Sequence, residues 1–269
     1  MIRVAIIGVT GRMGQALVRA AGDVPQIRIA GGVASAASSG VGRDIGELAA
    51  TAPLGLEASN DLASVLAQSD VAVDFSRSEA TAANLAACRA ARKPLLIGTT
   101  GFDVELAGDL EKAARDIAVL VAPNTSLAVT LLIELVRASA KSLPRDFDIE
   151  IIETHHRMKR DAPSGTALAL GRAAAEGRGS ELAKAAVLNR SGVHERHEGD
   201  IGFAVVRGGD IAGEHSVLFA GDGEQLVLQH RAADRAIFAR GALRAAAWLA
   251  GKPPGRFSMR DVLGYKSIT

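Results

Sequence analysis

The chain has 269 residues, of which 48% are hydrophobic and 23% charged, the balance of a soluble globular protein with one large domain or two ordinary ones. A net charge of +1 argues against nucleic acid as a partner, and 3% aromatic residues support neither base stacking nor a membrane belt. The single cysteine, Cys88, excludes an internal disulfide and a cysteine-rich metal site, and its alanine-rich surroundings predict a buried thiol. No apolar run reaches the roughly 18 residues that cross a bilayer, and the sequence opens directly on an expected strand, so we expect no membrane partner and a cytoplasmic location.

The first half of the chain alternates short apolar strands with helices. We expect strands at residues 2–7, 27–30, 71–75, 94–97 and 117–121. We expect helices at residues 15–21, 79–91 and 104–115, and a loop in the small-residue segment 34–46. This alternation is typical of a parallel sheet that is covered by helices on both faces.

A glycine-rich turn, Gly8-Val-Thr-Gly-Arg-Met-Gly14, connects the first strand to the first helix. Its spacing is G-x-x-G-x-x-G rather than the usual G-x-G-x-x-G. The physical effect is similar, since glycines permit a tight turn and let backbone amides approach a pyrophosphate. Arg12 adds a charge that could reach a phosphate. At this place in the chain the pattern favours a dinucleotide site over a purely structural turn.

The end of the second strand bears on the choice of cofactor. Sites that prefer NAD usually carry Asp or Glu about 20 residues past the glycines, where it binds the ribose hydroxyls. Here the segment Ala30-Gly-Gly-Val-Ala34 offers no acid, and Ser35, Ser38 and Ser39 follow. Because no carboxylate repels a 2′-phosphate, we predict that NADPH is used at least as well as NADH.

Two further strand ends are candidates for the same cleft. Gly98-Thr-Thr-Gly101 and Ala122-Pro-Asn-Thr-Ser126 each follow an expected strand. In an open parallel sheet the ligand lies beyond the carboxyl ends of the strands, where small residues permit close contact. Ordinary turn chemistry explains either segment equally well when it is taken alone.

The second half has a different pattern. A helix is expected at 129–141 and a strand at 148–153, and strands at 201–206, 215–219 and 225–230 are separated by glycine turns, which predicts antiparallel hairpins. A last alanine-rich helix, 236–250, is expected to return to the first domain. We therefore expect a dinucleotide-binding domain of residues 1–126 plus 236–269, and a substrate-binding and oligomerisation domain of residues 127–235.

The segment from Glu153 to Thr166, ETHHRMKRDAPSGT, is the most informative in the chain. Five of its six residues from His155 to Arg160 can carry positive charge. Ser164 is expected to cap a following helix, whose first-turn N–H groups at Gly165 and Thr166 would favour an anion. A solvated basic loop is the alternative. The adjacent histidines, the lysine four residues after the first and the cap together favour a site for a small molecule with carboxylates or phosphates.

The other histidines and two arginines give weaker signals. The spacing of His194 and His197 would suit a metal pair on a helix, but their glycine-flanked setting favours a polar loop, and we expect no metal. His215 and His230 lie at the ends of expected strands, where an interface is one possible role. Arg235 and Arg240 open the last helix, and a solvated charge is the default for both.

Together these segments resemble the dihydrodipicolinate reductases (4-hydroxy-tetrahydrodipicolinate reductases). The resemblance is carried by the glycine turn, by Gly98–Phe102 and Ala122–Asn124, and above all by His155–Thr166. It extends through Gly208–His215 to Met259–Leu263 and so covers nearly the whole chain. The His-His-x-x-Lys…Pro-Ser-Gly-Thr pattern is highly specific, whereas the glycine turn alone is not.

The resemblance implies an α/β fold: a Rossmann-like dinucleotide-binding domain and a second α+β domain whose open mixed or antiparallel sheet builds a homotetramer. It implies NAD(P)H-dependent reduction of a cyclic dicarboxylate to tetrahydrodipicolinate on the diaminopimelate route to lysine. By matching positions, His155 would be the acid/base residue and Lys159 the proton donor, and the substrate would be bound by His156, Lys159, Gly165 and Thr166. The cofactor site would be lined by Gly8, Val9, Thr10, Gly11, Arg12, Met13, Arg77, Gly98, Thr99, Thr100, Ala122, Pro123, Asn124 and Thr125.

This chain departs from the family pattern at two places in the cofactor site. Ala34-Ser35 stands where the family often has an acid followed by a basic residue, which bears on cofactor preference and not on the reaction. Thr125 stands where a bulky aromatic is common, which implies a looser nicotinamide pocket.

Two other functions fit part of the pattern. One is a different nicotinamide-dependent dehydrogenase of the same two-domain plan that acts on an amino or keto acid. The other is a regulator that binds NAD(P)H and catalyses nothing. The His155 and Lys159 pair, and the lack of a basic helix–turn–helix segment, argue against the regulator. Turnover of reduced cofactor with the cyclic lysine precursor, compared with simple keto acids, separates the three.

Overall fold

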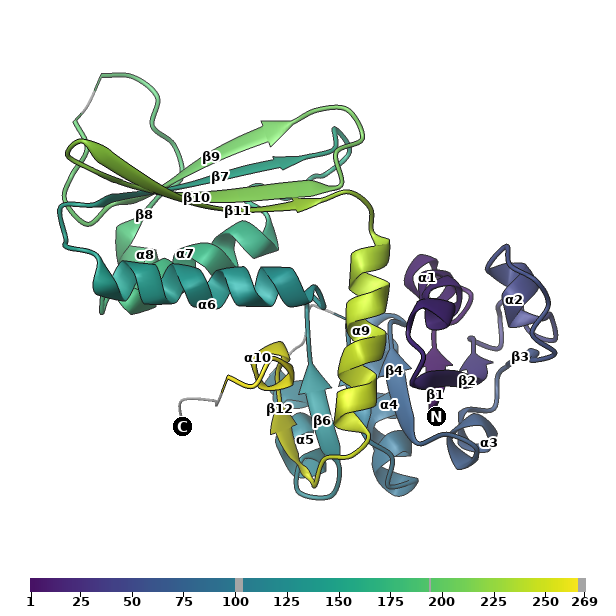
Figure 1. Cartoon of the computed structure of the whole chain (residues 1–269). Helices are drawn as coiled ribbons and strands as arrows, with labels where there is room; N and C mark the ends of the chain where they lie inside the picture. Colours follow the sequence, from purple (N-terminus) through teal and green to yellow (C-terminus); the bar gives the residue numbers. More distant parts are fainter. Residues whose placement is uncertain (100–103, 194, 266–269) are drawn as a thin grey trace. The chain divides into compact units, whose positions relative to one another are not determined.

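A computed structural model of the chain describes residues 1–99, 104–193 and 195–265. The chain divides into two compact units, Met1–Leu127 together with Ala236–Thr269, and Ala128–Arg235 (Figure 1). Within the described ranges, the helices are too short or too polar to span a membrane. Each unit is built on its own sheet and its own core.

The first unit contains a seven-stranded sheet with the order β12-β6-β5-β4-β1-β2-β3. Every pairing in it is parallel, which confirms the expected sheet. Its strands are β1 (Ile2–Ile7), β2 (Ile27–Val33), β3 (Ala58–Ser59), β4 (Val71–Asp74), β5 (Leu95–Ile97), β6 (Ala118–Val121) and β12 (Gly255–Phe257). The edge strands β3 and β12 were not expected, since segments of two and three residues are too short to show a periodic pattern.

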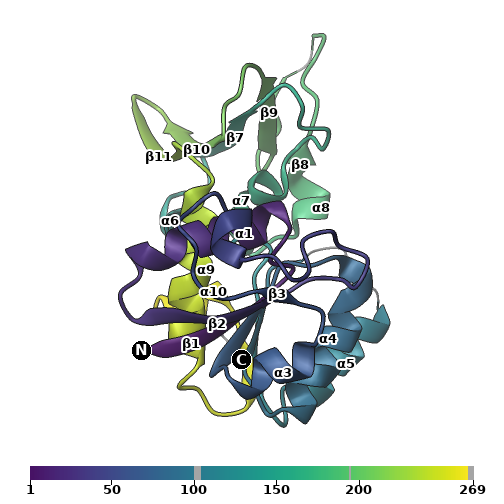
Figure 2. The ribbon, with the colours of Figure 1, turned by 90° about the vertical axis from the view of Figure 1, so that its right-hand side faces the viewer.

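Helices cover both faces of this sheet (Figure 2). Their bounds are α1 (Arg12–Ala20), α2 (Ile45–Leu48), α3 (Leu62–Ala67), α4 (Ser78–Ala90), α5 (Val104–Ala113), α9 (Ala236–Leu249) and α10 (Met259–Val262), with a 3₁₀ turn η1 (Ala21–Asp23). Apolar side chains of α1 and α9 pack on one face, and those of α3, α4 and α5 on the other. Cys88 lies on α4 in this second layer, and burial raises the pKa of its thiol to about 12, as expected for a structural cysteine.

The second unit contains a five-stranded sheet with the order β11-β10-β7-β9-β8. The strands are β7 (Asp148–His155), β8 (Ala186–Val187), β9 (Ile201–Arg207), β10 (Gly213–Gly221) and β11 (Glu224–Ala232). The helices of this unit are α6 (Leu127–Ser142), α7 (Gly165–Gly177) and α8 (Leu182–Ala185). Side chains of α6 and α7 pack on one face of the sheet and form its core with inward residues of β7, β9 and β10.

The pairing of β9 corrects one expectation. The hairpin of β10 and β11 is present, closed by a turn with Gly223 at φ +80°. Strand β9, however, does not pair with β10, because β7 lies between them and runs parallel to β9. The turn signals after β9 are the same for a hairpin and for a chain that crosses to the far side of a neighbouring strand, so the local pattern could not separate the two.

Alternation along β7 places two polar residues in the core face. Ile149 and Ile151 point toward the helices, and Glu153 and His155 continue the same alternation, with all four side chains buried. Glu153 is paired with His215 on β10, which is also buried. The sheet therefore brings a carboxylate and two imidazoles together at one end of its inner face.

Candidate active site

The strands β1, β4, β5 and β6 end together at one edge of the first sheet. Register pairs Ile7 with Asp74, Asp74 with Ile97, and Ile97 with Val121. Strand β1 lies between β4 and β2, so the order of the strands reverses beside it. An open parallel sheet binds its ligand beyond the carboxyl ends of the strands at such a switch point.

The glycine turn at this edge requires its glycines. Gly8 has φ +83°, and a Cβ there would lie 2.9 Å from the carbonyl oxygen of Phe75. A Cβ on Gly14 would lie 2.2 Å from the carbonyl oxygen of Gly8, so α1 packs directly on the turn. Gly11 is the N-cap of α1 and no side chain caps this helix. The start of α1 therefore fits the pyrophosphate of a dinucleotide. The pyrophosphate would accept hydrogen bonds from the first backbone amides of the helix.

The loop after β2 packs against the glycine turn. The Ser38 hydroxyl donates to Thr10 Oγ1 at 3.3 Å, and a Cβ on Gly40 would lie 2.6 Å from the Thr10 methyl. Ala34, the first residue beyond β2, is buried, and its amide donates to Ser59. The structure thus places the acid-free segment beside the turn, where the adenosine ribose would lie in a fold of this type.

The loop after β4 is held by a buried acid that sequence reasoning did not single out. Asp74 accepts hydrogen bonds from the Ser76 amide at 2.8 Å and from Asn84 at 2.9 Å, and burial raises its pKa. Arg77 follows this loop at the start of α4, and its side chain is 89% exposed. Asp74 therefore shapes the loop that precedes the exposed Arg77, whose guanidinium lies 3.8 Å from the Glu79 carboxylate.

The residues that follow β5 and β6 differ in their exposure to solvent. Thr99 is buried and shares a hydrogen bond with Thr81 at 3.0 Å. Thr100 lies outside the described residues. After β6, Pro123 is exposed, whereas Thr125 is buried and its hydroxyl donates to the Phe238 carbonyl on α9 at 2.7 Å. The side chain at this last position is therefore fixed inside the protein.

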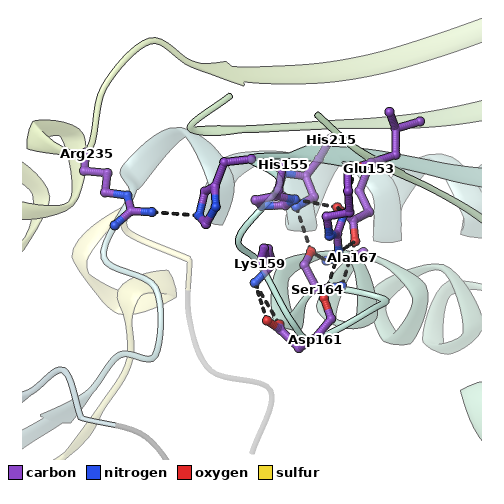
Figure 3. Close-up of polar contacts among 11 residues, drawn as sticks. Glu153, His155, Lys159, Asp161, Ser164, Ala167, His215 and Arg235 are labelled. Atoms are coloured by element: carbon purple, nitrogen blue, oxygen red, sulfur yellow. Dashed lines mark hydrogen bonds and ion pairs between the residues drawn. The ribbon is translucent and has the colours of Figure 1, made fainter. Parts of the chain in front are cut away.

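In the second unit, Glu153 lies at the centre of a polar cluster (Figure 3). His155 Nδ1 is 2.5 Å from Glu153 Oε2. Both terminal nitrogens of Arg207 donate to the carboxylate, each at 2.8 Å, in the bidentate geometry that makes arginine a strong partner. The Ser164 amide donates to Oε1 at 2.9 Å.

Ser164 caps α7, as expected from the sequence. Its hydroxyl oxygen accepts from the Ala167 amide at 3.2 Å and lies 3.0 Å from His215 Nε2. Gly165 and Thr166 form the first turn of the helix. The cap is thus tied to β7 through Glu153 and to β10 through His215, which fixes the direction of the amides at the start of α7.

Lys159 lies beside this cluster (Figure 3), and His156 follows His155 directly in the chain. The Lys159 ammonium is 2.8 Å from each carboxylate oxygen of Asp161, and the Lys159 side chain is 19% exposed. The hydrogen bond from Lys159 lowers the pKa of Asp161, whose own side chain is 61% exposed. Arg235 is exposed, as expected for a solvated charge, and it also donates to His156 Nε2 at 2.9 Å. Because arginine can only donate, the proton of a neutral His156 is on Nδ1.

The cluster has a defined charge state near neutral pH. Burial alone would raise the pKa of Glu153, but Arg207, His155 and the Ser164 amide outweigh it and hold that pKa below its ordinary value. Burial lowers the pKa of His155, against the opposite pull of Glu153. Burial and the neighbouring His155 lower the pKa of His215 to about 4. The carboxylate is therefore ionised while both imidazoles are neutral.

Sequence reasoning identified His155, His156, Lys159 and the cap, but not Glu153, Arg207 or His215 as parts of the same cluster. Glu153 could have been found, because the alternation along β7 puts it on the face of Ile149 and Ile151. His215, given as an interface candidate, is buried beside His155 with ring centroids 5.0 Å apart. Arg207 had no local signal, since its place opposite His155 follows from the parallel pairing of β9. His194 lies outside the described residues, and no described group of three or more His, Cys, Asp or Glu could hold a metal.

Comparison with known proteins places the whole chain in one family. The family model for the dihydrodipicolinate reductase N-terminus matches residues 2–125, and that for its C-terminus matches residues 128–263. The chain is 46% identical over 267 residues to a 4-hydroxy-tetrahydrodipicolinate reductase of Anaeromyxobacter dehalogenans, with 99% of both chains covered. It is 48% identical over 263 residues to that of Alkalilimnicola ehrlichii, covering 97% of this chain and 98% of the relative.

A solved structure supports the same fold. The dipicolinate-bound dihydrodipicolinate reductase from Paenisporosarcina sp. TG-14 matches with a TM-score of 0.77 at 24% identity, over 96% of this chain and 97% of that one. The chain therefore belongs to the 4-hydroxy-tetrahydrodipicolinate reductase family, NAD(P)H-dependent oxidoreductases that form tetrahydrodipicolinate on the diaminopimelate route to lysine.

Proposed function

We propose that His155 and Lys159 perform the proton chemistry of this reduction, and that the start of α7 binds a carboxylate of the substrate. The observation that carries the proposal is the cluster itself: a buried imidazole oriented by a carboxylate, next to an ammonium and a capped helix start. The dipicolinate bound by the Paenisporosarcina reductase is a planar ring with two carboxylates, and it supports a ligand of this class.

Carboxylate binding follows from the geometry of the segment. The amides of Gly165 and Thr166 belong to the first turn of α7, where the helix dipole favours a negative charge. Lys159 adds a full positive charge. Its partner Asp161 is 61% exposed, so this carboxylate can return to solvent when a substrate carboxylate takes its place beside Lys159. His156, held by Arg235, adds a further polar contact at the edge of the site.

Proton transfer is assigned to Lys159 and His155. The reduced nicotinamide, when bound, supplies the hydride for a conjugated carbon of the ring. The electron-rich product then needs a proton, which Lys159 can donate from its ammonium. The neutral His155 ring can accept a proton and return it, and His155 is the acid/base residue. Lys159 also stabilises negative charge that develops on the ring.

A structure of the protein with NADPH and pyridine-2,6-dicarboxylate tests the binding assignment. We expect one carboxylate to accept from the Gly165 and Thr166 amides, and Lys159 to contact the dianion in place of Asp161. A dianion bound away from α7 and from Lys159 would overturn the assignment.

We further propose that the dinucleotide binds at the switch point of the first sheet. The residues that line it in this proposal follow the carboxyl ends of four strands: Gly8, Val9, Thr10, Gly11, Arg12, Met13, Arg77, Gly98, Thr99, Thr100, Ala122, Pro123, Asn124 and Thr125. The open start of α1 and the exposed Arg77 supply donors for phosphate. Because the Thr125 hydroxyl donates to the Phe238 carbonyl on α9 and the Thr125 carbonyl packs against Gly241, its side chain does not form a wall of the pocket.

NADPH is expected to be used at least as well as NADH, because Ala34 and the serines after it present no carboxylate to a 2′-phosphate. The measurement is kcat/KM for both cofactors in an optical assay. The Ala34→Asp variant is expected to shift the ratio of kcat/KM values toward NADH. The Ala34→Asn variant, in which the new side chain has the size of Asp but no charge, is expected to shift this ratio much less. A strong NADH preference in the unaltered protein would contradict the prediction.

We propose a homotetramer in the cytoplasm. The face of the second sheet opposite the helices carries exposed apolar side chains, which include Ile152, Val206 and Val227. A patch of this kind on a sheet is typical of a subunit interface. The mass of the assembly in solution, measured by light scattering, tests the subunit number.

A further inference from the structure

The Glu153 carboxylate is saturated by four donors. Oε2 lies 2.5 Å from His155 Nδ1 and accepts from Arg207 at 2.8 Å. Oε1 accepts from the Ser164 amide at 2.9 Å and from the other terminal nitrogen of Arg207 at 2.8 Å. The residue is 1% exposed. A buried carboxylate held by four hydrogen bonds from three residues has a fixed orientation, so its position determines that of the groups bound to it.

This saturation decides where the proton of His155 resides. The Arg207 fork keeps Glu153 ionised, and an ionised carboxylate can only accept hydrogen bonds. His155 Nδ1 must therefore carry a hydrogen, and Nε2 is left as the nitrogen that gains or loses a proton. Gly213 lies on that side of the ring, where a Cβ would come within 3.0 Å of Nε2. A glycine at this place leaves Nε2 uncrowded.

The same carboxylate also holds the start of α7. Ser164 is the N-cap of that helix. Its amide donates to Glu153, and its hydroxyl oxygen accepts from the Ala167 amide. One side chain of β7 thus connects the imidazole to the helix turn that begins with Gly165.

We propose that Glu153 is a positioning residue that holds His155 with its proton on Nδ1, so that proton exchange with the substrate takes place at Nε2. Arg207 is the counter-charge that keeps Glu153 ionised, and the Ser164 contact sets the distance between the imidazole and the carboxylate-binding turn. This inference rests on the proposed role of His155 as the acid/base group. A carboxylate that orients a catalytic imidazole has the same effect in serine proteases, where an uncharged amide in its place favours the wrong tautomer.

A purely structural role makes different predictions. If the Glu153 and Arg207 pair served only to fill the end of the sheet, its loss would lower stability without changing the tautomer of His155 or the pH dependence of turnover. The two roles are therefore separated by spectroscopy and by the pH profile, and not by activity alone.

The test is Glu153→Gln, which keeps the shape and removes the charge. The amide oxygen can still accept from Ser164, while the amide nitrogen donates to His155 Nδ1 and moves the ring proton to Nε2. We expect kcat to fall at least about tenfold and KM for the dicarboxylate to change by less than about threefold. In ¹⁵N NMR of histidine-labelled protein, with the His155 signals assigned by their loss in His155→Ala, the protonated nitrogen should change from Nδ1 to Nε2.

The pH profile gives a second readout. The charged and titratable groups that face His155 are Glu153, Lys159, Arg207 and His215. Removal of the Glu153 charge takes away the one group among them that favours the imidazolium. The limb of the kcat/KM profile that reports His155 should therefore move to lower pH, whether the protonated or the neutral ring is the active form.

Arg207→Lys is the matched control. It removes the bidentate fork but keeps a positive charge beside Glu153, so Glu153 stays ionised, still accepts from Nδ1, and the His155 tautomer should be unchanged. If Glu153→Gln does not fold with an unpaired Arg207, the double variant Glu153→Gln with Arg207→Met removes both charges and should show the altered tautomer.

Each failure has its own signature. The positioning role requires that His155→Ala lowers turnover. If it does, an unchanged His155 tautomer and an unmoved pH limb in the Glu153→Gln variant or the double variant would overturn the positioning role. Near-normal turnover in His155→Ala would instead overturn the proposed function on which that role rests.

Discussion

Replacing Lys159 by alanine is expected to lower turnover by about 10²-fold or more and to raise KM for the dicarboxylate substrate. The first effect follows from loss of the proton donor and of the charge that stabilises the developing anion. The second follows from loss of a direct contact to a carboxylate. Steady-state kinetics with varied substrate separates the two, because a residue that only binds substrate changes KM and leaves kcat intact.

Arg160→Ala provides the control for Lys159. Arg160 is exposed, lies one residue away and carries the same charge, so its loss reports the general effect of removing a cation from this segment. We expect turnover in this variant to stay close to that of the unaltered protein. A Lys159→Ala variant that behaved like Arg160→Ala would reject both roles given to Lys159.

Replacing His155 by alanine is expected to lower turnover by about 10²-fold or more, with a smaller effect on KM, since the ring exchanges a proton and is not assigned a carboxylate. Glu153 keeps its contacts to Arg207 and the Ser164 amide in this variant, so the cluster retains most of its hydrogen bonds. The pH profile should also lose the limb that reports the imidazole. The measurement is kcat and kcat/KM across the pH range in which the protein stays folded.

A second histidine serves as the reference for His155. His197 is exposed, and its backbone amide and carbonyl both form hydrogen bonds with Asp200, which do not involve the ring, so His197→Ala should keep both turnover and the pH limb. Thermal unfolding of both variants shows whether a loss of activity reflects unfolding. Turnover near the original level in a folded His155→Ala protein would remove His155 from the mechanism.

The first sheet was predictable because most residues of its longer strands are buried. Segments such as Ile2–Ile7 and Val71–Asp74 are apolar runs bounded by turn residues, and helices between them have clear periodicity. The short strands β3 and β12 carry no such signal. The prediction that β9 forms a hairpin with β10 was wrong. The register of β9 and its neighbour in the sheet are set by packing on α6 and α7, and not by the turn that follows the strand.

The candidate site was only partly visible in sequence. His155, Lys159 and Ser164 lie within ten residues of one another, so their combination could be read as a motif. Arg207 and His215 are about 50 residues further along the chain, and nothing in their local sequence indicates a partner for Glu153 or Ser164. The roles of the predicted site residues stay predictions until the variants are measured.

By itself, the sequence determined which segments form apolar strands and helices, where the glycine turn lies, and that a cationic segment precedes a capped helix. These are local properties, set by periodicity, by backbone freedom and by capping within a few residues. Only the tertiary structure decided that β7 lies between β9 and β10, and hence that Arg207 and His215 meet Glu153 in the core. The physical reason is that burial and charge pairing act between residues distant in sequence, so the charge state of an imidazole depends on neighbours that no local pattern names.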